Sequence, residues 1–429
     1  MGTGIAGLSA AWALSREHRV TVYEADDRLG GHAHTVEVLD GDRRVPVDTG
    51  FIVYNERNYP NLTRLFAHLG VASEPTDMSF SVSKAHGAFE YQARALGLIA
   101  APTNLLRRDY RRMVAEIIRF TRQAPREVAA QYGETTRQLL DRMDLSETFR
   151  RDFLLPVVAC IWSSSLDAML DMPARSLIGF LDNHGLLNVT ERPRWRTVTG
   201  GSREYVARLS APFASKARLR TAVTEILRVP GGVMVRDARD GVERFDHVVL
   251  ATHADTSLRI LGRDADPAER NVLSAFSYQE NLAVLHRDAS VMPKRHAVWS
   301  SWNYLSDDRS PDGRERVSVS YWMNRLQNLQ TERPVILTIN PSREPRDIER
   351  THTYHHPQFD TASLAAQSVL PSLQGVRNTW FCGSYFGMGF HEDGLRSGLE
   401  VAAALRSPAP WWDAPVASPE PGVPEGIGR

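Results

Sequence analysis

Cysteine and lysine are both scarce in this sequence. Only Cys160 and Cys382 occur among its 429 residues, which is too few for a disulfide framework, and their spacing is not that of metal ligands. We therefore expect a reducing compartment. The lysines are Lys84, Lys216 and Lys294, so arginine carries almost all of the positive charge.

Long apolar runs and a net charge are also absent. No run reaches about 18 apolar residues, the length that predicts a membrane-spanning helix, and we expect no secretory leader. Lys plus Arg and Asp plus Glu number 51 each, so no overall field favours nucleic acid as a partner. We expect a cytoplasmic protein, and peripheral contact with the inner face of the membrane stays an open alternative. The length fits two domains.

The N-terminal residues carry a nucleotide-binding pattern. Gly2, Gly4 and Gly7 form G-x-G-x-x-G at the start of an apolar helical run, and a short strand at 20–23 precedes Glu24. Such glycines permit a tight turn and a close approach of the backbone to a pyrophosphate, while the helix N-terminus offers free N–H groups. An acidic residue about 20 positions later accepts hydrogen bonds from an adenosine ribose. By itself the motif also fits a plain glycine-rich turn.

A second glycine pair strengthens this pattern. Arg28, Gly30, Gly31 and His32 form R-x-G-G-H. The glycines let the chain pass close to the same diphosphate, and Arg28 can neutralise its charge. Together the two motifs predict a bound dinucleotide.

The start of the pattern is unusual. Only Met1 precedes the first glycine, although such a unit should begin with a buried parallel strand. Either the start codon has been placed too late or the chain lacks a central strand. We expect the former, because losing an inner strand would leave its neighbours unpaired and expose apolar surface.

A third glycine motif lies near the end of the chain, where residues 379–398 read as a strand, a glycine loop and a helix with a small-residue face. The three motifs resemble those of the flavin-containing amine oxidase and phytoene desaturase superfamily. Segments 183–187, 321–329 and 389–394 are similar to a bacterial branch of predicted NAD/FAD-binding flavoproteins. Members of that branch are often encoded beside cyclopropane fatty acid synthase-like methyltransferases.

The resemblance implies an α/β fold, with a Rossmann-like FAD-binding domain of the amine oxidase type and an interleaved α+β substrate-binding domain. It implies FAD rather than exchangeable NAD, since NAD enzymes usually lack R-x-G-G. The FAD should be non-covalent, because no cysteine stands at a linkage position. The expected FAD-binding domain is discontinuous, over 1–75, 195–270 and 376–407. The substrate-binding domain is expected over 76–194 and 271–375, followed by a disordered, proline-rich tail at 408–429.

The resemblance also implies cofactor-binding residues. The segment around Gly50 should run beside the isoalloxazine ring, the residue at Val223 should bracket adenine through its backbone, and the last helix should point its N-terminus at flavin N1 and O2. The implied set is Gly2, Gly4, Ile5, Ala6, Gly7, Glu24, Arg28, Gly30, Gly31, His32, Gly50, Phe51, Val223, Gly383, Ser384, Gly394 and Leu395. Two positions depart from the superfamily: Ser384 replaces an acidic residue, and His32 replaces a second arginine.

The expected reaction is hydride transfer between FAD N5 and an apolar substrate. The methyltransferases that are encoded beside members of the branch indicate that this substrate is a lipid acyl chain. His391 is the first acid/base candidate by position, followed by Tyr354 and Glu392. The substrate pocket is expected at Tyr54, Tyr321 and Phe390, the last being where amine oxidases place an aromatic residue.

Two other reactions stay open. An amine oxidase would use a lysine that binds N5 through water, and Lys294 lies in a turn context that fits this poorly. The other alternative is an FAD-dependent isomerase without net redox change. The histidines of 352–356 lack matching acidic or cysteine ligands, so we expect no metal.

A basic amphipathic helix is predicted between Leu105 and Leu140. Its arginines alternate with apolar residues, so the part from Leu105 to Phe120 can lie on an anionic membrane. It can equally be an outer helix whose apolar stripe packs inward while the arginines face water. The oligomeric state is not predicted.

Overall fold

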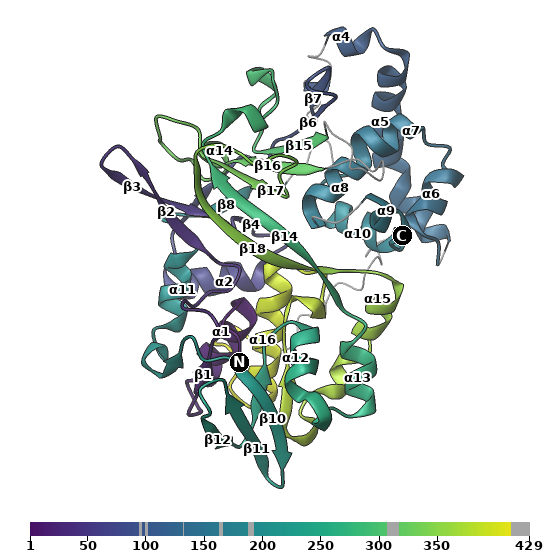
Figure 1. The fold of residues 1–429 in the computed structure, drawn as a ribbon. Helices are drawn as coiled ribbons and strands as arrows, with labels where there is room; N and C mark the ends of the chain where they lie inside the picture. Colours follow the sequence, from purple (N-terminus) through teal and green to yellow (C-terminus); the bar gives the residue numbers. More distant parts are fainter. Residues whose placement is uncertain are drawn as a thin grey trace.

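Two long strands connect the two halves of the molecule. The computed structural model describes residues 1–93, 97–98, 102–131, 133–162, 166–187, 193–306 and 317–412. Strands β14 (Ser277–His286) and β18 (Ile348–Gln358) pair antiparallel from Ser277↔Gln358 to His286↔Ile348. They cross the centre of the molecule, with the glycine-motif helices at one end and a large sheet at the other (Figure 1).

The glycine-motif half contains two short parallel strand pairs. These pairs are β1 (Val22–Tyr23) with β9 (Ala217–Arg218) and β13 (Val248–Leu250) with β19 (Thr379–Phe381). The remaining strands of this half form β2 (Thr35–Asp40) with β3 (Arg43–Asp48), the set β4 (Val53–Asn55), β8 (Trp195–Val198) and β5 (Ser73–Pro75), and the set β10 (Val223–Val229), β11 (Gly232–Asp237) and β12 (Val242–Phe245).

The first two residues lie between the parallel pairs. The Met1 ammonium donates to Val249 O at 2.9 Å, Ala251 N donates to Met1 O at 2.9 Å, and Gly2 N donates to Tyr23 O at 2.9 Å. Met1 and Gly2 thus join β1 to β13 where the sequence pattern requires a central strand. Burial lowers the pKa of the Met1 ammonium. Residues upstream of Met1 stay a prediction.

Helices pack closely around these strands. They are α1 (Ile5–Leu14), α2 (Pro60–Leu69), α11 (Arg203–Ser210), α12 (Ala254–Leu261), α13 (Pro267–Leu273), α15 (Thr361–Gln367) and α16 (His391–Ala404). The contact between α1 and α16 needs small residues, because a Cβ at Gly398 would lie 2.2 Å from Ala6 O. The glycine motifs at the two ends of the sequence are therefore neighbours in space.

The other half is built on a seven-stranded sheet. Its order is β18-β14-β17-β16-β15-β6-β7, and only the β15/β6 pair is parallel. The strands not yet described are β6 (Phe80–Lys84), β7 (Phe89–Gln92), β15 (Trp302–Ser306), β16 (Ser318–Trp322) and β17 (Ile336–Ile339).

Helices lie on one side of this sheet (Figure 1). They are α4 (Pro102–Leu105), α5 (Arg108–Ala130), α6 (Thr136–Arg142), α7 (Glu147–Phe149), α8 (Leu155–Trp162), α9 (Leu166–Asp171) and α10 (Ala174–Asn183), while the short α14 (Met323–Leu326) follows β16. A large apolar core joins the sheet to these helices and includes Phe120, Leu177, Tyr321 and Tyr354. No helix in the described ranges is long and apolar enough to cross a membrane.

The expected α/β architecture is confirmed, whereas the domain boundaries stay a prediction. Part of the expected tail is ordered. Trp411 stacks on Trp12 of α1 with ring centroids 5.5 Å apart, and Arg16 donates to Pro408 O at 2.8 Å. Disorder is thus the wrong expectation for residues 408–412, because the aromatic side chains bury apolar surface on α1. Residues 413–429 lie outside the described part of the chain.

Candidate active site

The first glycine motif forms a turn in front of α1. A Cβ at Gly2, where φ is 83°, would lie 2.7 Å from Ala251 O, and a Cβ at Gly7 would lie 1.9 Å from Gly2 O. A Cβ at Gly4 would meet no atom within 4 Å. Gly4 therefore faces open space. The N-terminus of α1 has no side-chain cap there, so its N–H groups can bind a phosphate.

The second glycine pair lies against this turn. A Cβ at Gly31 would lie 2.8 Å from the Cα of Gly4, and a Cβ at Gly30 would lie 2.5 Å from Ala33 O. The Arg28 guanidinium donates to Gly31 O at 2.7 Å and to Ala33 O at 3.2 Å. Arg28 thus orders the loop while its charge stays beside the open space.

The two residues that are expected to bind adenosine, Glu24 and Val223, lie on neighbouring segments. Glu24 Oε2 accepts hydrogen bonds from Thr3 N at 2.8 Å and from the Thr3 hydroxyl, and Oε1 accepts from Asp26 N at 3.0 Å. Thr221 N donates to Glu24 O at 2.8 Å, which brings the start of β10, with Val223, beside Glu24. A ribose hydroxyl would share the Glu24 carboxylate with Thr3.

The third glycine motif completes the site from the other end of the chain. Gly383 N donates to Ser397 Oγ at 2.9 Å. A Cβ at Gly394 would lie 3.0 Å from Ile5 Cγ2 and 3.7 Å from Ser384 N. The side chains of Ile5, Ala6 and Leu395 are buried in the core, so only their main chain is available to a cofactor. The N-terminal turns of α1 and α16 therefore lie side by side.

His391, the first catalytic candidate, lies between two aromatic residues. Its imidazole stacks on Phe51 with ring centroids 3.9 Å apart and an interplanar angle of 10°. Its Nε2 lies 2.6 Å from the buried Tyr205 hydroxyl. Burial lowers the pKa of His391 to about 3, so the ring is neutral at pH 7. Phe51 is in turn fixed by its N–H, which donates to His32 O at 2.8 Å.

Glu392 points away from the glycine loops. One carboxylate oxygen accepts from Asn61 N at 2.9 Å and Asn61 Nδ2 at 2.8 Å, and the other accepts from Leu62 N at 3.0 Å. Glu392 thus satisfies the free N–H groups at the start of α2. Burial raises its pKa to about 7, against the effect of these hydrogen bonds. The structure supports a structural position for Glu392 and does not bring it to the other catalytic candidates.

Tyr354 is tied to the segment before Phe51. Its hydroxyl lies 2.7 Å from Thr49 Oγ1 and 3.3 Å from His34 Nδ1. A Cβ at Gly50 would lie 3.2 Å from the same hydroxyl. Burial raises the pKa of Tyr354 to about 12.

Two of the three expected pocket residues share one apolar environment. Tyr321 belongs to the large core, and Phe390 packs against it, but Tyr54 belongs to the core beneath α1 and α2. Side chains alternate along β4, so Val53 packs against the large core, while Tyr54 faces α2 and its hydroxyl lies 2.8 Å from Ser73 Oγ. Tyr54 therefore lies in a different core from Tyr321 and Phe390.

Sequence reasoning missed the aromatic partners of Phe390. Phe180 of α10 stacks on Phe390 with centroids 4.9 Å apart and an interplanar angle of 15°. His184, just after α10, also stacks on Phe180 at 3.9 Å, and its ring centroid lies 5.4 Å from that of Phe390. The amphipathic pattern of 174–183 predicts burial but not this contact, which depends on where α10 packs.

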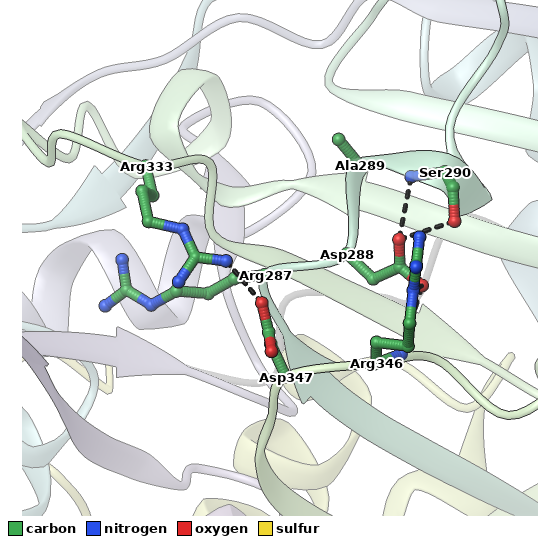
Figure 2. A pocket seen from close by; sticks show the side chains of 7 residues that line it. All are labelled: Arg287, Asp288, Ala289, Ser290, Arg333, Arg346 and Asp347. Carbon is green, nitrogen blue, oxygen red and sulfur yellow. Dashed lines mark hydrogen bonds and ion pairs between the residues drawn. The ribbon is translucent and has the colours of Figure 1, made fainter.

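A charged cavity elsewhere is not the candidate site. It measures about 340 Å³, lies at the end of β14 and is lined by residues outside the three glycine motifs (Figure 2). Its charges are paired, since Arg333 bonds Asp347 and Arg346 Nε lies 3.5 Å from Asp288. Within the described ranges, no three His, Cys, Asp or Glu side chains are grouped so that they could hold a metal ion.

The glycine turns and the paired N-termini of α1 and α16 fit FAD, because the position beside Gly4 is open and lined by N–H donors. They define an FAD-dependent oxidoreductase. The chain belongs to the flavin-containing amine oxidoreductase family, whose profile matches residues 5–406.

Solved structures show the same fold at low sequence identity. Cyclohexylamine oxidase from Brevibacterium oxydans IH-35A is 17% identical with a TM-score of 0.66, over 94% of this chain and 97% of that chain. Putrescine oxidase bound to putrescine is 15% identical with a TM-score of 0.65, over 94% and 97% of the two chains. A CLA-producing fatty acid isomerase from P. acnes is 16% identical with a TM-score of 0.65, over 94% and 96%. No curated protein matches the sequence.

Gly4→Val should abolish FAD retention without unfolding the apoprotein, because the new Cβ enters space that the protein leaves open. Gly7→Ala should lower the melting temperature of the apoprotein as well, since its Cβ would lie 1.9 Å from Gly2 O. Flavin absorbance per polypeptide and thermal melts of both apoproteins test this. A Gly4→Val protein with a full complement of FAD would place the pyrophosphate elsewhere.

Glu392→Gln should reduce the free energy of unfolding by about 1–3 kcal/mol, because an amide has one oxygen for three N–H donors. Urea titration measures the change, and Glu400→Gln is the matched control, since Glu400 pairs with Arg396 on the half-exposed side of α16. Unchanged stability together with a large loss of turnover would instead assign Glu392 to catalysis.

Proposed function

We propose that this flavoprotein transfers a hydride between FAD and an apolar substrate that carries a lipid acyl chain. The observation that carries the proposal is the stack of Phe390 on Phe180, which leads from the first turn of α16 into the large apolar core. Bound FAD supplies the hydride-transfer chemistry at N5. The N-terminus of α16 would stabilise negative charge on a flavin ring held beside it.

The residues around the Phe390–Phe180 stack favour an uncharged substrate. Phe390, Phe180 and Tyr321 offer aromatic surface, and burial keeps the nearby imidazoles of His184 and His391 neutral by lowering their pKa to about 4 and about 3. A long alkyl chain loses no hydration of charge on entering such a pocket, whereas an ammonium group would. His391 and Tyr354 are the proposed proton carriers, and Glu392 is the weakest of the three for the reason given above.

The lysines give no support to an amine oxidase. Lys84 pairs with Asp152 at 2.9 Å, and a Cβ at Gly87 would lie 2.8 Å from the Lys294 side chain, so Lys294 packs on the β6–β7 turn. Lys216 is exposed after α11. A fatty acid isomerase is among the similar structures. The second candidate function is therefore a non-redox reaction on the same class of substrate.

Anaerobic incubation with phospholipid vesicles should bleach the flavin absorbance, whereas cyclohexylamine and putrescine should not. Phe180→Asp should suppress the bleaching by at least tenfold, because it places a charge beside Phe390. Tyr54→Phe should not, because Tyr54 lies in the other core. Spectra and lipid mass spectrometry measure both effects. Bleaching by the amines alone would establish the amine oxidase alternative, and altered lipid without bleaching the isomerase.

We also propose that α5 docks the protein on an anionic membrane. Its buried residues, among them Met113 and Phe120, face the core, as an outer helix requires. On the opposite side, no partner in the described ranges pairs with the exposed Arg108, Arg122 or Arg126. Exposed apolar side chains accompany them, namely Leu106 at 81% and Ile118 at 47% exposure. Arginines beside exposed apolar residues fit a lipid surface.

Replacing Arg108, Arg111, Arg122 and Arg126 with Gln should release the protein from vesicles of anionic lipid, since each arginine contributes about 1 kcal/mol near such a surface. Arg107 is retained because it lies 5.2 Å from the Phe89 ring. Vesicle sedimentation at low and high salt measures binding. The control replaces Arg236, Arg239, Arg244 and Arg263, and equal loss in both variants would remove α5 as the docking face.

A further inference from the structure

Three histidines from distant segments meet beside the first glycine turn. His32 follows Gly31, His253 precedes α12, and His356 lies in β18. The ring centroid of His32 lies 6.4 Å from that of His253 and 5.7 Å from that of His356. These three residues are called the histidine cluster below.

The segments that carry His32 and His253 flank the glycine turn on two sides. A Cβ at Gly31 would lie 2.8 Å from Gly4, and a Cβ at Gly2 would lie 2.7 Å from Ala251 O and 3.4 Å from Thr252. All three cluster residues are half-buried, so their side chains border accessible space. The same turn leaves the open space at Gly4 that fits a pyrophosphate.

The cluster has ring nitrogens available to a ligand. Asn281 Nδ2 donates to His356 Nδ1 at 3.2 Å, so the proton of the neutral His356 ring is on Nε2. In the described part of the chain, no hydrogen bond reaches the ring nitrogens of His32 or His253. His253 is held instead by stacking on Tyr278, with centroids 4.2 Å apart.

Few charges surround these rings. Tyr354, His391 and His352 face His32, with the Tyr354 ring centroid 5.0 Å away. His355 faces both other rings, and Asp255 is the acidic group that faces His253. Burial first, then repulsion between the histidines, lowers the pKa of His32 well below its usual value and that of His356 to about 4. The cluster is therefore neutral at pH 7 before an anion binds. Arg28 supplies the fixed positive charge nearby.

We propose that His253 and His356 join His32 as binding residues for the FAD pyrophosphate, and that the histidine cluster takes up a proton when FAD binds. A phosphate anion beside an imidazole favours the charged ring, so binding and protonation are coupled. Lowering the pH therefore strengthens FAD binding. An arginine at these positions would supply its charge at every pH.

The test is calorimetry of FAD binding to the apoprotein in two buffers of different ionisation enthalpy between pH 6 and pH 8. Net proton uptake is expected. For each proton taken up, the dissociation constant of FAD should fall up to tenfold when the pH is lowered by one unit. His356→Gln and His253→Gln should each reduce the uptake and the pH dependence. His32→Arg should bind FAD with little pH dependence.

The control is His247→Gln, which changes an exposed histidine beside Trp380, outside the cluster. Thermal melts of each apoprotein verify folding. Because the variants lie on three different segments, the test still holds if one of them does not fold. Binding heats that do not depend on the buffer would overturn the proposal. Undiminished proton uptake in both His253→Gln and His356→Gln would also overturn it.

Discussion

The buried carboxylate of Asp48 is the interaction on which the arrangement of the site depends. It accepts hydrogen bonds from Ser202 N at 2.9 Å, Ser202 Oγ at 2.7 Å, Thr35 Oγ1 at 2.5 Å and Gln327 Nε2 at 2.8 Å. The Asp48 N–H also donates to Gln327 Oε1 at 2.8 Å. One side chain thus connects the start of α11, the β2–β3 hairpin and the segment after α14. Burial raises its pKa to about 6, and the donors act in the opposite direction. Because Gln327 comes from the large-sheet half, Asp48 fixes that half against the glycine-motif half.

The residues that follow Asp48 show what this constraint achieves. Residues 49–51 each contact a different part of the site. Their partners are Tyr354, His32 and His391, respectively. A shift of this segment by one residue would reverse the sides to which the side chains point. The candidate active site therefore lies at the junction of the two halves, and no single continuous segment could build it.

Burial without a charged partner is the common feature of the ionisable groups at this junction. His391 and Tyr354 keep their neutral forms at pH 7, and the Glu392 carboxylate is directed into the N-terminus of α2. The side chains at this junction therefore bring little charge of their own. This environment suits hydride transfer from or to carbon, for which the protein supplies position and dryness.

The sequence by itself determined the cofactor and the main glycine contacts. A close approach of the backbone to a phosphate requires glycine at fixed short spacing, so Gly2, Gly4 and Gly31 are recognisable without a structure. The orientation of side chains, in contrast, could not be predicted from the sequence. Strand alternation turns Tyr54 toward α2, and the packing of α16 on α2 makes Glu392 a helix cap. The meeting of His32 and His356 also needed the tertiary structure, because such contacts depend on how distant elements pack and leave no pattern in the local sequence.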